Sequence, residues 1–450
     1  MRKKLKEETI IFIGVLKWLV LASIVGIIVG FSTSIFLKIL NWATLGAAQY
    51  SYYFLLLPIA FLLSTILIKT LAPEAEGHGT EKVIEAVHKR SGRIKAAVVP
   101  VKLVATVITL AFGGSAGKEG PSAQIGAGMA SIFADFLRFD DVDRKKLVIC
   151  GISGGFASVF GTPVAGAIFG VEVLFVGGIL YEVLLPSFVA GLVSFQVSSY
   201  MGISYFHQPL NFIPAFSEVI FLKVIAAGVF FGVCSFLLVE GLRLGKKAAE
   251  SIKWSMPLKA MLGGAVLVVL SFIFSTQYLG LGLDPMQAAL EGKPVAPYAF
   301  ILKIMFTSIT LNFGGSGGIV TPIFFIGATA GSFIGTVLGA SPVLFAAIGL
   351  VSLLSGCANT PIAASIMAAE LFGSGVSSYA AVACIISYII TGHRSVYPSQ
   401  ILSAKKSSSL SVRFGEEIEN VNPEYQHREK SLIGLLRRAY RRMRGSEGDR

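Results

Sequence analysis

The sequence predicts an all-α protein that crosses a membrane several times. Of its 450 residues, 54% are hydrophobic and 14% are charged, whereas soluble domains carry about a quarter charged residues. Apolar runs long enough to cross about 30 Å of hydrocarbon recur along the chain, and three of them start at Ile10, Tyr52 and Val224. Glycine-rich stretches interrupt other apolar runs, so we expect broken helices beside continuous ones.

The first apolar run follows the basic segment MRKKLKEET. It is too long for a secretion signal and lacks a clear small-residue cleavage site, so we expect a retained membrane helix. Much of the net charge of +12 lies near the chain ends. The positive-inside rule then places both termini in the cytoplasm. Residues 403–450 are expected to be a basic cytoplasmic tail that does not bind nucleic acid. From Ser431 the tail either forms a basic amphipathic helix on the lipid surface or is a simple solvated tail.

Two segments of the chain are similar in register. VKLVATVITLAFGGSAGKEGPSAQIGAGMAS begins at Val101, and LKIMFTSITLNFGGSGGIVTPIFFIGATAGS begins 201 residues later. A second pair, FGTPVAGAIFGVEVLF and CANTPIAASIMAAELF, recurs at an offset of 198 residues and contains Glu172 and Glu370. The repeats predict a membrane domain over 1–402 that is built from two homologous halves.

The halves are expected at about 10–200 and 215–400, with a junction between Asn211 and Lys223. Repeats of this kind are common in transporters and place the site where the halves meet. The four cysteines are scattered through apolar stretches without metal-ligand spacing or a disulfide framework, so we expect no metal site.

The stretches GGSAGKEGP (113–121) and GGSGGIVTP (314–322) interrupt their apolar runs at matching places. Irregular backbone at membrane depth is tolerated only where it is buried in protein or lines a wet cavity. Each proline suits the first turn of a helix, so we expect a break followed by a helix that begins inside the membrane. Two converging helix N-termini would stabilise an anion through partial charges. A phosphate-binding loop is excluded by its spacing, and close helix packing alone explains only one or two of the glycines.

Glu119 lies at the start of the first of these helices. A carboxylate in hydrocarbon costs several kcal/mol unless it is paired, hydrated or protonated. Beside a helix N-terminus it can take the place of the anion, as a tethered competitor that protonation releases. We therefore expect anion passage to depend on pH.

Taken together, these motifs resemble the CLC family of chloride channels and chloride–proton antiporters. GKEGP, GGIVTP and GHGTEKVIEAV resemble its anion-site motifs, and SVYPSQIL resembles its last site segment, so the match covers roughly residues 10–402. The resemblance implies a homodimer with one pore per subunit, two inverted-topology halves and broken helices that meet at the bilayer midplane. The resemblance is to prokaryotic members of the family, because the tail is too short for C-terminal nucleotide-sensing domains.

The resemblance also assigns site residues. Glu119 matches the gating glutamate, and the backbone N–H groups of Glu119, Gly120, Ile319 and Val320 match those that bind chloride. Tyr397 matches the tyrosine whose hydroxyl donates to chloride. Chloride is then the bound substrate, and no cofactor is expected.

Several positions depart from the family's pattern, and one position indicates which anion is carried. His78 stands where a serine commonly meets the anion, and Val320 replaces a commoner phenylalanine. Val173 stands where proton-coupled members usually carry an inner glutamate, and valine cannot carry a proton. Val173 therefore favours channel-like or weakly proton-coupled transport, with exchange through an atypical inner proton path as the alternative. Pro121 favours chloride, because fluoride specialists depart from this proline.

The leading function is transport of chloride or a similar small anion across the inner membrane of a cell. A membrane-embedded enzyme that uses Glu119, Glu172, His78 and Glu370 fits less well, because HExxH and paired-carboxylate spacings are missing. A sodium-coupled solute carrier is a further alternative. We expect Glu172 to be paired within the helix bundle, and its repeat partner Glu370 favours a structural role for both.

Overall fold

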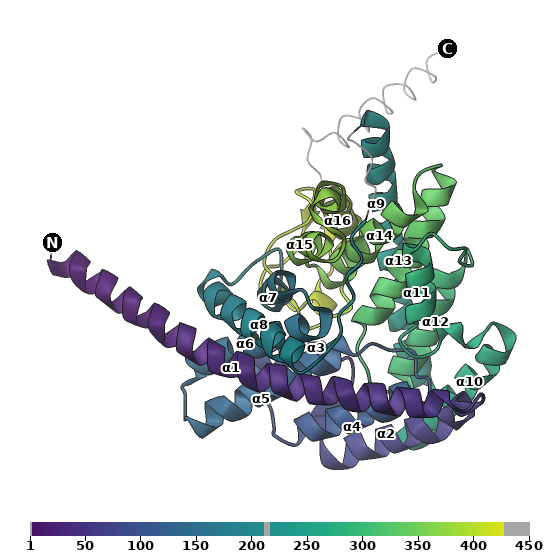
Figure 1. Ribbon diagram of the computed structural model, residues 1–450, viewed down its shortest axis with the longest axis horizontal. Helices are drawn as coiled ribbons and strands as arrows, with labels where there is room; N and C mark the ends of the chain where they lie inside the picture. The colour runs from purple at the N-terminus through teal and green to yellow at the C-terminus, as the bar shows by residue number, and fades with distance from the viewer. Residues whose placement is uncertain (1, 211–216, 427–450) are drawn as a thin grey trace, which may run out of the picture.

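The computed structural model describes residues 2–210 and 217–426. In these residues the chain forms sixteen α-helices and two sheets of two short strands each, so the all-α prediction is confirmed. Figure 1 shows α1 (Arg2–Ala48) lying across one side of the molecule, with its N-terminal part projecting beyond the other helices. Within the described ranges, six helical segments are long and apolar enough to cross a membrane: Lys6–Ala48, Tyr53–Leu71, Tyr181–Tyr200, Glu218–Ser251, Met256–Ile273 and Val320–Val337.

The first half of the chain continues, after α1, with seven further α-helices. They are α2 (Leu57–Leu71), α3 (Thr80–Lys89), α4 (Val98–Ala111), α5 (Glu119–Phe136), α6 (Asp141–Phe160), α7 (Pro163–Glu172) and α8 (Tyr181–Tyr200). Short 3-10 turns, η1 (Tyr53–Leu56) and η2 (Pro73–Ala75), precede α2 and α3.

The second half contains the other eight α-helices. They are α9 (Glu218–Ser251), α10 (Met256–Ile273), α11 (Leu283–Leu290), α12 (Ala299–Asn312), α13 (Val320–Val337), α14 (Pro342–Ala358), α15 (Pro361–Phe372) and α16 (Ser377–Ile390). The 3-10 turns are η3 (Thr276–Tyr278), η4 (Ser374–Val376) and η5 (Ile418–Asn420). Strand β1 (Phe175–Val176) pairs in parallel with β2 (Ile401–Leu402), and β3 (Leu410–Ser411) pairs antiparallel with β4 (Glu424–Tyr425).

The boundary expected between the halves is too long. Because α9 begins at Glu218, the stretch up to Lys223 is helical and does not belong to a junction. Ser217 explains the early start, since its side chain accepts a hydrogen bond from Ile220 N and so caps the helix. Residues 211–216 lie outside the described residues.

The repeated sequences fold alike. In each copy a helix (α4 or α12) is followed by a break and then by an 18-residue helix (α5 or α13). Gly113 and Gly314, which open the two breaks, have φ of 98° and 95°, in the region that favours glycine. The predicted breaks are therefore present. A third pair, which sequence analysis missed, is the loop before α3 and the loop before α11, where Gly77 and Gly280 also have positive φ.

Serine and threonine side chains join the two breaks in a reciprocal way. Ser115 N donates to Thr310 Oγ1, and Ser316 N donates to Thr109 Oγ1, both at 2.9 Å. The two serines are 201 residues apart, as are the two threonines, so each contact is repeated by the corresponding residues of the other copy. Contacts that come in such pairs are what two halves related by a twofold axis produce.

Two glutamates cap each other's helices. Glu172, the last residue of α7, accepts hydrogen bonds from two first-turn amides of α15, at 3.0 and 2.8 Å. Glu370 of α15 accepts from two first-turn amides of α7, at the same distances. First-turn amides lack partners within their own helix and favour negative charge. Both acids are therefore paired inside the helix bundle, as expected from the sequence, and their partners are backbone amides. The donors are Ile362, Ala363, Val164 and Ala165.

Part of the expected tail packs onto the helices. Lys406 is half-buried against the ends of α14 and α16, where its Nζ donates to Asn359 Oδ1 at 2.6 Å and to the Tyr388 carbonyl at 2.7 Å. Residues 427–450, including the amphipathic helix expected from Ser431, lie outside the described residues.

We expect Glu370→Gln to lower the stability of the detergent-solubilised protein by about 1–3 kcal/mol, because one first-turn amide of α7 then faces an NH2 group instead of a carboxylate oxygen. The midpoint of thermal unfolding measures the change. Glu250→Gln, at an exposed position of α9, removes the same charge and should leave the midpoint where it is. Equal midpoints for the two variants would contradict the capping role.

Candidate anion-binding site

Two helix N-termini meet inside the protein. α5 begins at Glu119 and α13 begins at Val320. The breaks before them are joined by a reciprocal pair of backbone hydrogen bonds, from Gly117 N to Gly318 O and from Gly318 N to Gly117 O, each 2.6 Å long. The partial positive charges of two helix N-termini therefore converge. The prediction that the broken helices meet is confirmed.

The first backbone amides of both helices are free. In the described part of the chain, the amides of Glu119, Gly120, Ile319 and Val320 donate to no backbone acceptor. These are the four residues that the family resemblance selected. Free amides at a helix start, with the dipole behind them, can bind an anion.

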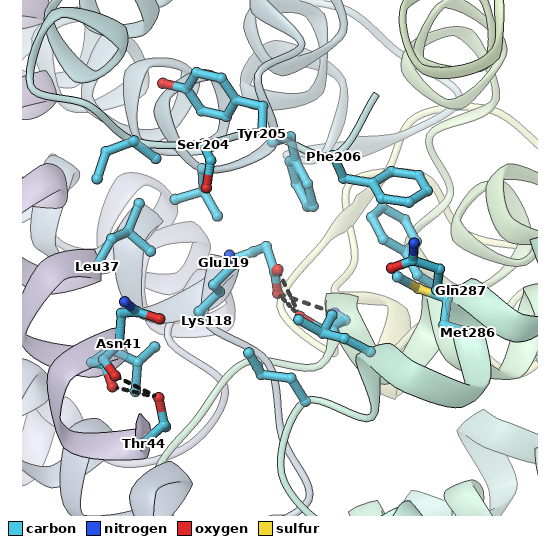
Figure 2. Close-up of a pocket in the computed structure, with 18 of the residues that line it drawn as sticks. Leu37, Asn41, Thr44, Lys118, Glu119, Ser204, Tyr205, Phe206, Met286 and Gln287 are labelled. Atoms are coloured by element: carbon cyan, nitrogen blue, oxygen red, sulfur yellow. Dashed lines mark hydrogen bonds between the residues drawn. The ribbon is translucent and has the colours of Figure 1, made fainter. Parts of the chain in front are cut away.

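The Glu119 side chain reaches from α5 to the start of α13. Its Oε2 accepts a hydrogen bond from Thr321 N at 3.0 Å, and both carboxylate oxygens lie 2.6 Å from Thr321 Oγ1. Figure 2 shows this contact as dashed lines at the edge of a cavity. The carboxylate, which is 2% exposed, thus uses donors of α13 that an anion could otherwise use. This is the geometry that a tethered competitor requires.

Thr321 is a site residue that sequence reasoning missed. It lies in the GGIVTP motif, for which the resemblance assigned only backbone groups. Its counterpart 201 residues earlier is Gly120, so only the second copy carries a hydroxyl at this place. The signal that could have found it is a comparison of the two copies position by position, in which Thr321 stands against Gly120 and Val320 against Glu119.

A cavity of about 450 Å³ leads to Glu119. Its walls come from α1, from residues 203–206 and from the start of α11, as Figure 2 shows. Lys38 and Lys118 line it together with Glu119, so the charges at its wall attract anions. We call this cavity the vestibule. Its other lining residues include Asn41, Tyr205, Phe206, Met286 and Gln287.

The loop that carries His78 packs against both helix starts. Gly77 and Gly79 flank His78 with φ of 83°. A Cβ on Gly120 would overlap the His78 carbonyl oxygen and would lie 3.1 Å from Gly318 Cα, so only glycine allows this approach. His78 Nδ1 is buried without a hydrogen-bond partner in the described structure and is available to a ligand.

Two buried lysines hold matching loops. Lys102 Nζ donates to the Ala75 and Gly77 carbonyls at 3.1 and 2.6 Å, and this fixes the loop before His78. In the second half, Lys303 Nζ donates to the carbonyls of Tyr278 and Gly280 at 3.1 and 2.9 Å. Both lysines are fully buried, and each holds its loop through two carbonyl oxygens.

Tyr397 and Val173 lie in different surroundings. The Tyr397 side chain is fully buried, its hydroxyl has no hydrogen-bond partner among the described residues, and it lies within electrostatic range of Glu119. Val173 follows the end of α7, where its carbonyl accepts a hydrogen bond from Gln400 Nε2 at 2.7 Å and its side chain is buried. In the described residues, no group of three or more His, Cys, Asp or Glu side chains could hold a metal ion.

Comparison with known proteins identifies the family. The model of the family described as voltage gated chloride channel matches residues 59–392. A chloride/fluoride channel protein of Pseudomonas syringae pv. tomato is 34% identical over 87% of this chain and 87% of its own length. The voltage-gated ClC-type chloride channel ClcB of Escherichia coli is 28% identical over 71% of this chain and 79% of its own length.

A solved structure matches the fold. The crystal structure of a CLC-type fluoride/proton antiporter superposes with a TM-score of 0.83 at 27% sequence identity. The match covers 86% of this chain and 98% of that one. The CLC-type fold predicted from the sequence motifs is therefore confirmed.

We expect Thr321→Val to weaken the attachment of the Glu119 carboxylate to α13 by about 1.5–3 kcal/mol, the usual range for a hydrogen bond to a charged group. An added halide then competes more easily, and its binding should tighten roughly tenfold or more at a pH where the carboxylate is ionised. Calorimetric titration of the purified protein measures this. Thr321→Ser keeps the hydroxyl and should bind as the wild type does. Unchanged or weaker binding by Thr321→Val would show that Thr321 does not hold a competitor.

Proposed function

Because the chain belongs to the voltage-gated chloride channel family of anion transport proteins, we propose that it exchanges a small halide for protons across a membrane. The observation that supports this most is the Glu119 carboxylate held at the start of α13 by Thr321. The carboxylate must leave before an anion can use those donors. Protonation removes its charge and so releases it, which makes proton binding and anion binding depend on each other.

Fluoride and chloride are the candidate ions. The relative from Pseudomonas syringae is named for both, and the structure that matches this fold is a fluoride/proton antiporter. Pro121 and the ClcB relative favour chloride. A small anion is strongly hydrated, and the backbone N–H of Thr321, the Tyr397 hydroxyl and the His78 ring N–H are donors that can replace its water. We propose fluoride as the first ion to test and chloride as the second.

Passive anion conduction is the second candidate function, and Val173 favours it. Members of this family are channels or antiporters, and we propose that this chain is likewise a transporter, not an enzyme, and that it needs no cofactor. The transport domain in this proposal is 1–402, with halves at about 10–200 and 215–400 and a basic tail after it.

We propose that both termini lie on the cytoplasmic side of a cell's inner membrane. Lys17 of α1 and Arg93 each pair with an aspartate in the first turn of α6. Lys89 pairs with Glu417 near the end of the described chain. Ion pairs therefore connect the first half of α1 and the basic segment after α3 through the start of α6, and the end of α3 with the C-terminal segment. Cytoplasmic sides are rich in lysine and arginine.

We further infer a homodimer. Apolar side chains that are exposed in the single chain lie on α8, α15 and α16, among them Leu192, Ile362, Ile385 and Ile389. Light scattering in detergent should give twice the chain mass of 47.8 kDa after correction for bound detergent. A mass equal to one chain would contradict the dimer.

Reconstitution into liposomes tests the exchange. Vesicles are loaded with potassium fluoride or potassium chloride, and a potassium ionophore is added to make the membrane permeable to potassium. A halide electrode records halide efflux, and a pH electrode records proton movement. We expect halide efflux to drive proton uptake in a fixed ratio, even against a proton gradient. Halide efflux without proton movement would refute exchange and support the channel.

Glu119→Gln is the matched variant for this assay. The neutral amide imitates a permanently protonated carboxyl, so halide flux should continue, should no longer vary with pH and should not move protons. Loss of halide flux from a folded Glu119→Gln protein would contradict the role of competitor.

A further inference from the structure

Proton exchange requires a proton route between Glu119 and the solvent on the cytoplasmic side, and Val173 cannot carry a proton on that route. The polar contacts around Val173 supply no acid either. Gln400 Nε2 donates to the carbonyls of Val173 and Ala358 at 2.7 and 2.8 Å, and Asn359 Nδ2 donates to Gln400 Oε1. A side chain that carries protons to Glu119 must therefore come from another element.

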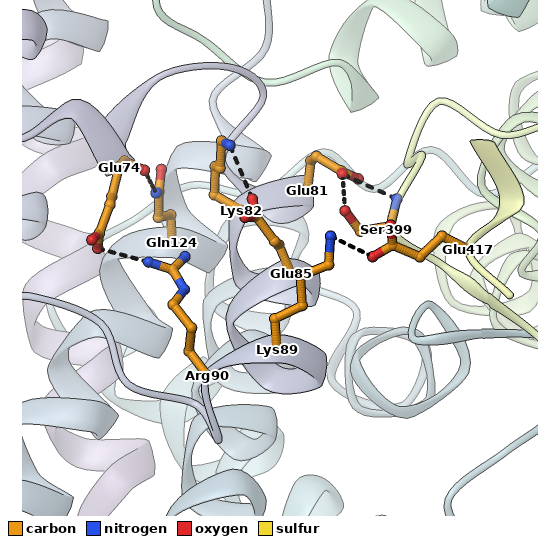
Figure 3. Close-up of polar contacts among 9 residues, drawn as sticks. All are labelled: Glu74, Glu81, Lys82, Glu85, Lys89, Arg90, Gln124, Ser399 and Glu417. Atoms are coloured by element: carbon orange, nitrogen blue, oxygen red, sulfur yellow. Dashed lines mark hydrogen bonds and ion pairs between the residues drawn. The ribbon is translucent and has the colours of Figure 1, made fainter. Parts of the chain in front are cut away.

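Glu81 is a carboxylate on the loop-and-helix element that carries His78. It lies in the first turn of α3 and is turned toward the segment after Tyr397, as Figure 3 shows. Its Oε1 accepts hydrogen bonds from Ser399 N at 3.0 Å and from Ser399 Oγ at 2.5 Å. Its Oε2 is buried and has no hydrogen-bond partner among the described residues. One oxygen thus holds the side chain in place, and the other is free to carry a proton.

Tyr397 is a neighbour that Glu81 and Glu119 share. The Tyr397 hydroxyl is within electrostatic range of both carboxylates. In the described structure, three further buried polar atoms have no partner: His78 Nδ1, Thr80 Oγ1 and the Tyr397 hydroxyl itself. Buried polar atoms are normally satisfied by protein, water or ligand. His78 and Thr80 precede Glu81 in the loop and first turn of α3, so water bound to these atoms can pass a proton from Glu81 toward Glu119.

The other face of α3 is open to solvent. Lys82 pairs with Glu85 at 2.9 Å, and Lys89 pairs with Glu417 at 2.7 Å, and all four side chains are partly or well exposed. Lys82, Glu85 and Lys89 follow Glu81 by one, four and eight residues on the same helix, as Figure 3 shows. The ionisable groups around Glu81 are therefore Lys82, Glu85 and Lys89 on its own helix and Tyr397 on the segment that packs against it.

We propose that Glu81 is the inner proton carrier of the exchange cycle, in the role that Val173 cannot fill. This inference rests on the proposed exchange function. A proton from solvent binds Glu81 Oε2 and passes through water beside the Tyr397 hydroxyl to the Glu119 carboxylate. Glu81 then returns to its ionised form. Only O–H bonds form and break, and each proton that leaves Glu81 neutralises Glu119 and releases it from Thr321.

Glu81→Gln tests the inference in the same liposome assay. Glutamine keeps the size of the side chain and an acceptor for Ser399, but it cannot carry a proton. We expect proton uptake to fall by roughly a hundredfold, the usual effect of losing a positioned proton-transfer group. Halide flux should continue, because Glu119 can still be protonated from the vestibule. Glu85→Gln removes a charge from the exposed face of the same helix and should leave the coupling ratio at the wild-type value.

The outcomes separate the two proposals. A wild-type protein that moves halide without protons overturns the exchange function and this inference together. A coupled wild type with an equally coupled Glu81→Gln overturns the inference alone. Calorimetric halide binding shows whether each variant is folded. If Glu81→Gln does not fold, Glu81→Asp decides, because a shorter acid slows proton uptake relative to halide flux if Glu81 carries the proton, and an unchanged ratio refutes that role.

Discussion

The backbone hydrogen bonds between Gly117 and Gly318 are the contact on which the rest of the site depends. A chain break inside a membrane leaves amide and carbonyl groups without partners, and each such group costs several kcal/mol in hydrocarbon. Here each break supplies the partners of the other, through the glycine pair and through the Ser115 and Ser316 amides, which donate to threonine hydroxyls of the opposite copy. Neither break is tolerable alone. The free amides at the two helix starts are therefore a product of the pairing of the halves.

Four ionisable side chains inside the protein are held by backbone groups. Glu172 and Glu370 accept from helix-start amides, and Lys102 and Lys303 donate to loop carbonyls. None of these four has to leave its place. Glu119 is held by one backbone amide and one hydroxyl, and both belong to a single residue, Thr321, at a helix start where an anion can also bind. A bond to a charged group is worth about 1.5–3 kcal/mol, which is small enough for a proton or a halide to displace the carboxylate.

Those features of the fold that depend on internal repeats and on hydrophobic runs could be predicted from the sequence. The broken helices and their meeting follow from the glycine-rich stretches at matching places. Contacts between side chains of different halves were not accessible, because an offset along the chain does not say which atoms face each other. Thr321 and Ser399 show this, since each contacts a glutamate more than 200 residues away in sequence. Helix ends were also missed where a local cap decides them, as Ser217 does for α9.

The two halves share their scaffold but not their chemistry. Lysines, serines, threonines and glycines of the scaffold recur at offsets near 200 residues, whereas Glu119 stands against Val320 and Thr321 against Gly120. A second carboxylate at position 320 would face the first across the joined helix starts, and two like charges so close could not both stay ionised. Instead, one helix carries the acid that competes with the anion, Glu119, and the other helix carries the hydroxyl that binds this acid, Thr321. The departure from symmetry therefore makes the meeting point a place where one charge at a time, carboxylate or anion, is stabilised.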